Sequence, residues 1–311
     1  NVLNFFSTPD TGRSVCGPSG TSGCRGADND TELNRQLAKI TTALVMIDAD
    51  IAGLIELENN ATESLDAIVD ALNTSIGASA YAYLDTGTIG DDAIKVGFIY
   101  KPASVSPSGD FELLTSTVDA RFNDDRNRPV LAQTFSQSSS GALITIAVAH
   151  LKSKGSSCDD IGDPNINDGQ GNCNRTRATA AAATADWLLS DPTDSGDSDF
   201  LLIGDLNAYI EEDPLTALAT DGRVNLVAAA SGSLAYSFVF DGQAGALDHA
   251  VASAELVPQI TGTTEWHINA DESPAHDYNL ENGRDAAIFD PATPYRASDH
   301  DPVIIGLDLT D

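Results

Sequence analysis

Short apolar runs of strand length alternate with amphipathic segments of helical spacing along the whole chain. Residues 31–48 and 63–76 repeat apolar side chains at the spacing of one helix face, and residues 177–189 are expected to form an Ala-rich helix. The runs expected to be strands are 51–57, 93–100, 143–150, 200–204, 247–252 and 302–309. No repeat or low-complexity linker divides the 311 residues. We therefore expect an α/β (α+β) fold in a single domain, 1–311.

The charge of the chain is strongly negative. Asp and Glu total 47 against 16 Lys and Arg, a net charge of −31. Dissolved ions screen such self-repulsion, which indicates an acidic, halotolerant protein. Nine of the basic residues fall between Lys95 and Arg177. They are either ordinary solvated surface charge or part of one basic face, and the sequence does not decide between the two.

The four cysteines form two close pairs in polar segments, 7–30 and 153–176, that we expect to be loops. Four cysteines permit three pairings, of which the local one is simplest, so we predict Cys16–Cys24 and Cys158–Cys173 disulfides. Zinc ligands usually come at closer spacing, which disfavours a zinc site. Disulfides indicate export, extracellular or periplasmic. The chain opens within a strand-like run, so we expect that upstream residues are missing.

Polar residues follow the apolar runs at several places. The run 200–203 leads into Gly204, Asp205 and Asn207, and the two polar side chains leave the strand on the same side. Asp299 and His300 precede the final apolar run, and His150 ends another. Each motif taken alone is a weak signal, because a lone carboxylate at a strand end is more often a cap or turn residue. Together they supply the acids, amides and imidazoles that phosphodiester hydrolysis needs.

In this order the motifs closely resemble those of the DNase I-like endonuclease/exonuclease/phosphatase superfamily. That family has F-N-x on its first strand, then Q-E, a catalytic His, G-D-x-N, L-D and S-D-H. The matching residues here are Asn1, Glu56, His150, Gly204–Asn207, Leu247–Asp248 and Ser298–His300. Ile55 stands where many members have Gln, and His249 where an aromatic or basic residue is frequent. Residues 55–60, 92–102, 150–155, 169–174 and 266–272 resemble the bacterial extracellular nucleases of this superfamily.

The resemblance implies a four-layer sandwich of two mixed β-sheets flanked by helices. It implies a divalent cation, Mg²⁺ first and Ca²⁺ or Mn²⁺ next, held by Glu56 with Asn1 and Asp299 as partners. The remaining roles are catalytic or phosphate-binding, and they fall on residues distributed along the chain. The expected catalytic residues are His150, Asp205, Asn207, Asp248 and His300, and the expected phosphate or substrate contacts are Arg128, Lys95, Lys152 and Lys154.

The resemblance also implies how the catalytic residues divide the work. His300 acts as general base or positions the attacking water, with Asp248 orienting its imidazole. Asp205 and Asn207 position water and a phosphate oxygen. His150 donates a hydrogen bond to the developing charge or protonates the leaving oxygen, and the sequence leaves both possibilities open.

The function that we expect is a secreted, metal-dependent endonuclease acting on DNA, with RNA as a further candidate substrate. A sphingomyelinase-like or other phosphodiesterase or phosphatase is the rival enzyme, and a non-catalytic binding domain is the rival outside enzymes. Neither Trp187 nor Trp266 lies in a tryptophan-rich insertion, which disfavours a lipid substrate. No apolar stretch approaches the length of a membrane span. We expect a monomer with nucleic acid as its partner and no contact with membranes.

Overall fold

The computed structural model describes residues 1–281 and 284–309, which form two compact units. The first unit contains Asn1–Ser106, Phe238–Ala244 and Trp266–Pro302. The second contains Pro107–Ser237, Gly245–Glu265 and the C-terminal segment from Val303. The chain passes between the two units repeatedly. Each unit has its own sheet and its own buried core.

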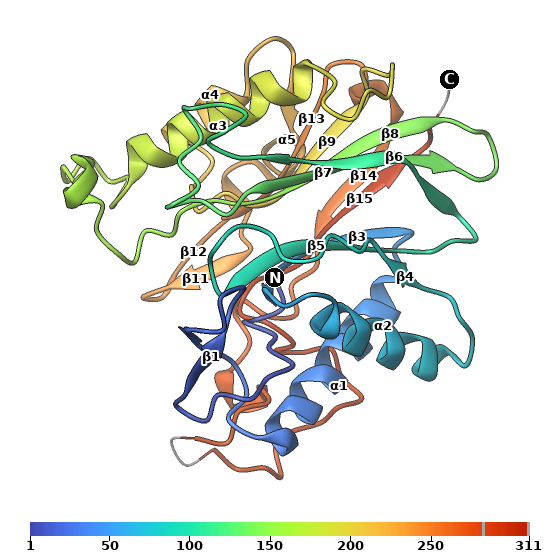
Figure 1. Ribbon diagram of the computed structural model, residues 1–311, viewed down its shortest axis with the longest axis vertical. Coiled ribbons are helices and arrows are strands. Elements are labelled where there is room, and N and C mark those ends of the chain that lie inside the picture. The colour runs from blue at the N-terminus through green and yellow to red at the C-terminus, as the bar shows by residue number, and fades with distance from the viewer. Residues whose placement is uncertain (282–283, 310–311) are drawn as a thin grey trace. The chain divides into compact units, whose positions relative to one another are not determined.

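The first unit is built on an antiparallel sheet of order β3-β5-β4. These strands span Ile51–Glu58, Ile94–Tyr100 and Ala82–Tyr83. Helices α1 (Asp30–Ile47) and α2 (Glu63–Ile76) cover one face of this sheet (Figure 1). The apolar faces of both helices meet the sheet in a core that includes Leu54, Leu57, Leu65, Ile68 and Leu72. The helix faces that the apolar spacing predicted to be buried are therefore the buried faces of α1 and α2.

The second unit is built on a six-stranded sheet of order β10-β13-β9-β8-β7-β6. In chain order its strands are β6 (Val105–Leu114), β7 (Val130–Gln137), β8 (Leu143–His150), β9 (Phe200–Asp205), β10 (Val224–Asn225) and β13 (Asp248–Ala252). The pair β8–β9 is parallel, whereas β7–β8 and β9–β13 are antiparallel. The sheet is therefore mixed, and the predicted mixed α/β class is confirmed.

Helices α3 (Asn174–Leu189) and α4 (Asp213–Leu218) cover one face of this sheet (Figure 1). The face of α3 toward the core is lined by alanines, among them Ala180, Ala181 and Ala183. Small side chains let the helix lie close to the strands. Helix α5 (Leu226–Ser231) and the antiparallel pair β14 (Ile260–Glu265) and β15 (Val303–Leu307) complete the unit.

Two short strand pairs and several 3-10 helices lie outside the main sheets. Strands β1 (Ser14–Cys16) and β2 (Ser22–Gly23) pair within the predicted loop 7–30, and β11 (Phe238–Phe240) pairs with β12 (Gln243–Gly245). Short 3-10 helices span Asp159–Ile161, Gly232–Leu234, Val257–Gln259 and Pro274–His276. No helix in the described part of the chain is both long and apolar enough to cross a membrane.

Most of the predicted elements occur within a few residues of their expected bounds. Strands β6 and β7 were not predicted, because Pro107 and Gly109 interrupt the first and polar residues dilute the second. Helix α1 begins at Asp30, one residue before the expected range 31–48. Asn29 is its N-cap, and the Asn29 side chain accepts from the backbone N–H of Thr31 and Glu32.

Both predicted disulfides are present. Cys16 joins Cys24 and Cys158 joins Cys173, with all four side chains buried. Cys173 also serves as the N-cap residue of α3, so the second bridge ties a polar loop to the start of a core helix.

The two bridges allow a graded test. The Cys158→Ser, Cys173→Ser double variant releases a loop of sequence separation 15, and we expect it to lose about 3 kcal/mol of unfolding free energy. The Cys16→Ser, Cys24→Ser variant releases a separation of 8 and should lose about 2.5 kcal/mol. Guanidinium titrations of the oxidised wild type and both variants measure the losses. Unchanged midpoints would contradict a structural role for the bridges.

Candidate functional site

In the first unit, Glu56 lies where strand β3 bulges. The register with β5 shifts between Leu54 and Leu57, and Glu56 has a left-handed backbone, φ 66°. Such a conformation is strained for a residue with a side chain, and it turns the carboxylate out of the regular strand. Glu56 Oε2 accepts hydrogen bonds from both the backbone N–H and the side-chain amide of Asn4, each 2.9 Å long.

The first six residues run beside β3 and hold this carboxylate. Val2 donates its N–H to the Ile55 carbonyl, and Phe5 donates to the Glu56 carbonyl. Leu3 and Asn4 both have positive φ, so the segment turns sharply between these two contacts. Buried Gln36 of α1 donates to the carbonyls of Val2 and Leu3 and stabilises the turn.

Asn1 contacts the S-D-H motif. The Ser298 hydroxyl lies 3.4 Å from Asn1 Oδ1 and 3.4 Å from Asp299 Oδ1. Asn1 Oδ1 also accepts from the Leu3 N–H at 2.7 Å, while its Nδ2 is buried and has no hydrogen-bond partner among the described residues. The structure therefore joins two motifs from opposite ends of the chain within one unit.

Asn269 clamps the backbone of the S-D-H motif. Its Nδ2 donates to the His300 carbonyl at 2.6 Å, and its Oδ1 accepts from the Ser298 N–H at 3.2 Å. Asp301 anchors the segment that carries Asn269. Its Oδ1 accepts hydrogen bonds from three consecutive backbone N–H groups, those of residues 268–270. Its Oδ2 lies 2.8 Å from His267 Nδ1. Asn269 and Asp301 are both buried. They position His300 by fixing the backbone on either side of it.

The predicted cation ligands of this unit fit a hard divalent ion. Glu56, Asn1 and Asp299 offer carboxylate and amide oxygens, which are the ligands that Mg²⁺ and Ca²⁺ prefer. Both bonds from Asn4 go to Oε2 of Glu56, and within the described residues no hydrogen bond is made to Oε1. Oε1 is therefore the oxygen of Glu56 that is available as a ligand.

A second group of acids lies elsewhere in the first unit. Asp28, Glu32 and Glu281 bring one carboxylate oxygen each within 4.8 Å of one another, the only such group of three His, Cys, Asp or Glu residues among those described. Glu32 is committed to the fold, because its oxygens accept from the N–H groups of Asp28 and Leu280. The pKa of Glu281 is raised, first by its contact with the Asp28 carboxyl.

In the second unit, strand pairing brings three predicted catalytic residues into one row. His150 of β8 is the register partner of Asp205 of β9, and Asp205 is the partner of Asp248 of β13. His150 and Asp205 lie side by side at the strand ends because the residue before Asp205, Gly204, pairs directly with Ala149 of β8. A Cβ on Gly204 would lie 2.0 Å from the Ala149 carbonyl oxygen, and φ there is 130°, so only glycine fits.

The G-D-x-N turn fixes the groups that follow. Asn207, with φ 49°, donates its backbone N–H to Asp205 Oδ1 at 2.7 Å. Its Nδ2 donates to Asp205 Oδ2 and to the Leu151 carbonyl. Asp205 Oδ2 also lies 3.6 Å from His150 Nε2. Both hydrogens of the Asn207 side-chain amide are used within the unit. The atom of this side chain that can bind a ligand is therefore the acceptor Oδ1.

Asp248 and His249 point to opposite faces of β13 and differ in chemistry. Asp248 Oδ2 accepts from the Ser237 hydroxyl at 2.7 Å, and that hydroxyl accepts in turn from the Asp248 N–H. His249 is fully enclosed, with Nε2 2.8 Å from the Ala208 carbonyl and Nδ1 3.1 Å from Asn225 Nδ2. Burial lowers the pKa of His249, so this imidazole is neutral and serves the fold.

Arg128, Lys152 and Lys154 belong to the same unit as the row. Arg128 lies beside the end of β8: its N–H donates to the His150 carbonyl and its Nη1 to the Leu151 carbonyl, each at 3.4 Å. Lys152 donates to Ser153 and Ser156. Lys154 pairs with Glu212 and lies 4.3 Å from the centre of the Tyr209 ring. Burial lowers the pKa of Lys154, and Glu212 opposes that effect.

Lys95 is held differently from the other predicted phosphate contacts. Its side chain is buried in the first unit, and its ammonium donates to the backbone carbonyls of Asn60, Ala61 and Gly87 at 2.6–2.9 Å. Burial lowers its pKa to about 8. The geometry does not support the predicted phosphate contact, because all three donors of the ammonium are used to join two loops.

Four supporting residues escaped the sequence analysis: Asn4, Ser237, Asn269 and Arg177. Arg177 is fully buried in α3 and donates to the carbonyls of Lys152, Gln170 and Asn172, which anchors the loop of the two lysines. Asn269 falls in 266–272, one of the segments that carried the family resemblance, so a signal existed for it. Nothing in the sequence distinguishes Asn4, Ser237 or Arg177 from ordinary polar residues.

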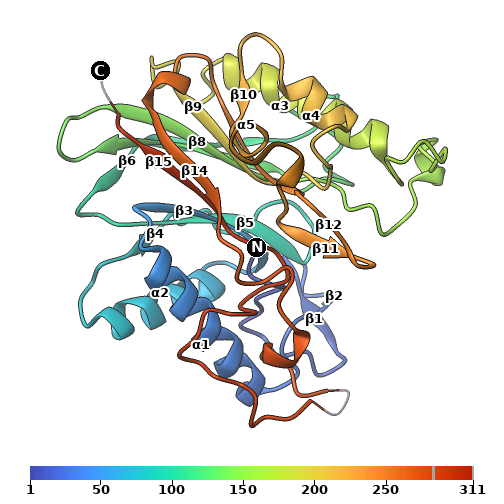
Figure 2. The ribbon, with the colours of Figure 1, turned by 180° about the vertical axis from the view of Figure 1, so that it is seen from behind.

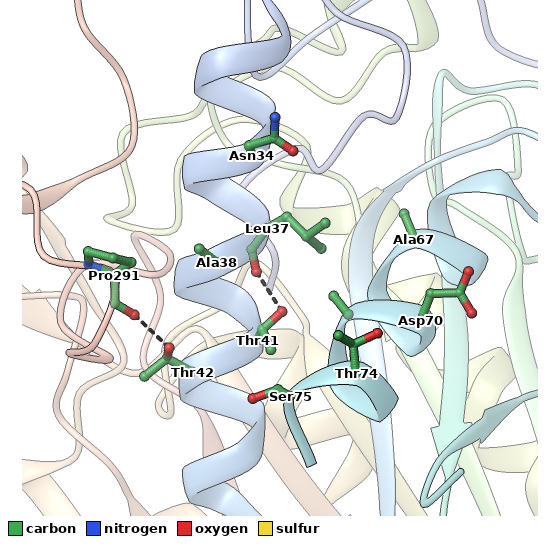
Figure 3. Close-up of a pocket in the computed structure, with 11 residues that line it drawn as sticks. Asn34, Leu37, Ala38, Thr41, Thr42, Ala67, Asp70, Thr74, Ser75 and Pro291 are labelled. Carbon is green, nitrogen blue, oxygen red and sulfur yellow. Dashed lines mark hydrogen bonds between the residues drawn. The ribbon is translucent and has the colours of Figure 1, made fainter. Parts of the chain in front are cut away.

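A surface groove of about 540 Å³ lies between α1 and α2 (Figure 3). Thr41, Thr42, Thr74, Asp70 and Pro291 are among its lining residues. The Thr41 hydroxyl donates to the Leu37 carbonyl, and the Thr42 hydroxyl donates to the Pro291 carbonyl (Figure 3). None of the predicted site residues lines it, so the groove is separate from the candidate chemistry.

The Asn269 clamp predicts a loss of stability. Asn269→Ala removes the hydrogen bonds that Asn269 makes with the Ser298 N–H and the His300 carbonyl in a buried loop, which should cost about 2 kcal/mol of unfolding free energy. Exposed Asn34→Ala is the matched control, with an expected change of about 0.5 kcal/mol or less. Urea denaturation measures both. Equal effects of the two substitutions would refute the clamp.

His249 predicts a pH dependence. Its pKa in the folded state is below the ordinary 6.5, so below pH 6.5 the unfolded chain binds a proton that the folded chain refuses. Stability due to this group is therefore present above pH 6.5 and is lost as pH falls, by at most about 1.4 kcal/mol per pH unit. His249→Asn should give a shallower decline of unfolding free energy between pH 7.5 and 5.5. Parallel curves for wild type and variant would contradict the assignment.

Solved structures with the same fold come from several sources. An endonuclease/exonuclease/phosphatase from Bacteroides vulgatus matches with TM-score 0.58 at 12% identity, covering 89% of this chain and 91% of that one. A Bacteroides thetaiotaomicron mannosyl-6-phosphatase gives 0.56 at 13%, covering 89% and 91%. TDP2 of D. rerio, complexed with a single-strand DNA product, gives 0.53 at 12%, covering 88% and 92%.

No curated protein matches the sequence. The model of the Endonuclease/Exonuclease/phosphatase family matches residues 1–300, nearly the whole length. That stretch includes every motif from Asn1 to His300 on which the resemblance rested. The chain belongs to the Endonuclease/Exonuclease/phosphatase family, whose members are hydrolases of phosphodiesters and phosphate esters.

Proposed function

We propose that the protein is a secreted, divalent-metal-dependent endonuclease that hydrolyses the phosphodiester bonds of DNA. The observation that carries the proposal is the row His150, Asp205 and Asp248, with Asn207 at its end, on neighbouring strands of one sheet. An imidazole beside carboxylates and an amide acceptor suits the activation of water in a family of phosphoester hydrolases.

Members of the family generally depend on a divalent metal ion. We propose Mg²⁺ as the ion, with Ca²⁺ and Mn²⁺ as the alternatives, and Glu56, Asn1 and Asp299 as the residues that hold it. The bound ion supplies positive charge to the phosphate. Glu56 suits this role because its backbone and Asn4 fix one carboxylate oxygen and leave the other presented.

The proton-handling residues are His300 and His150. His300, on a backbone held by Asn269, takes the proton of the attacking water or positions that water. His150 donates a hydrogen bond to the developing charge or protonates the leaving oxygen, and Asp205 Oδ2 lies 3.6 Å from its Nε2. Asn207 Oδ1 accepts a hydrogen bond from water, since its amide hydrogens are engaged elsewhere. Orientation of His300 by Asp248 stays a prediction.

Phosphate contacts fall to fewer cations than the sequence suggested. Arg128 is the leading residue, because it lies beside the end of β8 that carries His150. Lys152 and Lys154 add positive field from a loop anchored by Arg177. Lys95 has no part in the proposal.

The proposal extends to the bacterial extracellular nuclease branch, to a single functional domain, to a monomer and to DNA, with RNA as a second substrate to assay. The two disulfides support export. The fold is shared both by a TDP2 complexed with a single-strand DNA product and by a mannosyl-6-phosphatase, so a phosphate monoester belongs among the assays.

Plasmid nicking tests the activity. With Mg²⁺, Mn²⁺ or Ca²⁺ across a salt series, the wild type should convert supercoiled DNA to the open circle, and chelator should stop it. His300→Ala and His150→Ala should each slow nicking roughly 100- to 10,000-fold. His276→Ala, a half-buried histidine of the same unit as His300, is the matched control and should retain full activity.

A second readout is independent of catalysis. Mg²⁺ should raise the melting temperature of the wild type but not of Glu56→Gln, because a ligand that binds the folded state stabilises it. Hydrolysis of a sugar phosphate without DNA nicking would replace the nuclease proposal by a phosphatase. Undiminished activity in chelator would refute the metal dependence.

A further inference from the structure

The hairpin of β11 and β12 presents an aromatic residue that the fold does not use. Its two-residue turn is Asp241-Gly242, and both residues have positive φ, 48° and 76°. Asp-Gly with this geometry is the turn that matches the natural twist of two paired strands. The hairpin extends as a two-stranded ribbon (Figure 2). It is therefore a preorganised element whose side chains have defined directions.

One end of this ribbon contacts the S-D-H motif. The half-buried ring of Phe238 packs on the His300 imidazole, with centroids 4.6 Å apart and planes tilted by 32°. Both residues belong to the first unit. Because side chains two residues apart share a face of a strand, Phe240 faces the same side as Phe238. The strand rise places it roughly 7 Å further along the ribbon.

Phe240 is 62% exposed. A buried phenylalanine contributes about 1.5–3 kcal/mol that an exposed one does not, so the fold gains little from this ring. Its neighbours in the chain, Asp241 and Gln243, are exposed and polar, so the tip of the hairpin itself carries no run of apolar residues for a protein partner. What remains is a single flat aromatic face near a predicted catalytic imidazole.

We propose that Phe240 stacks on an unpaired nucleobase of the substrate, and that the enzyme prefers single-stranded or locally unpaired nucleic acid. The inference rests on the proposed nuclease function. In a duplex each base face is covered by its neighbours, whereas an unpaired base offers its π-face to an aromatic side chain. The base concerned lies within one or two nucleotides of the phosphate that reaches His300.

The charge of the protein supports stacking as the means of binding. Proteins that track nucleic acid by phosphate contacts need many cations, and this chain has a net charge of −31. Lys95 and Arg177 spend their donors on backbone carbonyls, and Lys154 is paired with Glu212. Stacking involves no charge and is worth roughly 1–3 kcal/mol per base. It therefore provides affinity that an acidic surface does not oppose.

A membrane is the other surface that an exposed aromatic residue can meet. Phe240 is followed directly by Asp241, and a carboxylate at the tip of the hairpin resists insertion into lipid. The protein's charge also opposes anionic bilayers. These observations favour the nucleobase, and vesicle binding becomes an outcome of the test.

The experiment compares kcat/KM on a labelled single-stranded oligonucleotide and on its duplex. Phe240→Ala should lower kcat/KM on the single strand roughly 5- to 100-fold, mainly through KM, with less than a twofold change on the duplex. Phe240→Trp should restore it, because tryptophan also stacks. Tyr295→Ala removes an exposed aromatic residue elsewhere in the first unit and should leave both rates unchanged.

An abasic scan locates the contact. A single abasic nucleotide is placed at successive positions along the strand. At one or two positions near the cut it should lower the cleavage rate of the wild type. At the same positions it should not lower the rate of Phe240→Ala any further. Equal losses on single strand and duplex, or unchanged rates, would overturn the inference while leaving the nuclease intact. Sedimentation of wild type but not Phe240→Ala with phosphatidylcholine vesicles would assign the ring to lipid. A wild type that cuts neither strand form would overturn the proposed function and this inference together.

Discussion

Strands β8 and β9 approach so closely at residue 204 that no side chain fits between them, and the candidate chemistry of the second unit depends on that contact. The parallel register sets His150 against Asp205 at the point where both strands end. The antiparallel register of β13 then adds Asp248 to the same row. A residue larger than glycine would separate the strands where the imidazole and carboxylate meet. The glycine of G-D-x-N is thus required by packing against β8. It allows Asp205 and Asn207, which come after it, to lie at the end of the strand.

In the first unit, a strained backbone at Glu56 places the carboxylate that is the candidate cation ligand. Glu56 leaves the regular path of β3 with a left-handed backbone, and the N-terminal segment turns sharply to donate twice to one of its oxygens. Gln36 holds that turn from α1. Strain at one residue persists because several hydrogen bonds from distant parts of the chain over-determine it. The arrangement presents a single carboxylate oxygen, which suits the binding of a hard cation.

Only 16 residues are basic, and four of them, Lys39, Lys95, Arg177 and Arg223, are buried. Arg177 and Lys95 are buried and donate to backbone carbonyls, so each of them joins loops of the fold. Few cations are left for a polyanionic substrate, so a bound divalent ion and an uncharged stacking contact become the natural sources of affinity. The composition and the proposed chemistry are consistent in this respect.

The sequence by itself determined the local features: the alternation of strands and helices, the polar residues that end the strands, and the two disulfides. These follow from periodicity and short spacings, which need no knowledge of distant contacts. Only the tertiary structure decided that Asn4 is the residue that holds Glu56, that Lys95 turns inward, and that Asn269 clamps His300. Long polar side chains choose partners by burial and by cross-strand register. Both depend on segments far apart in the chain, so no local pattern encodes them.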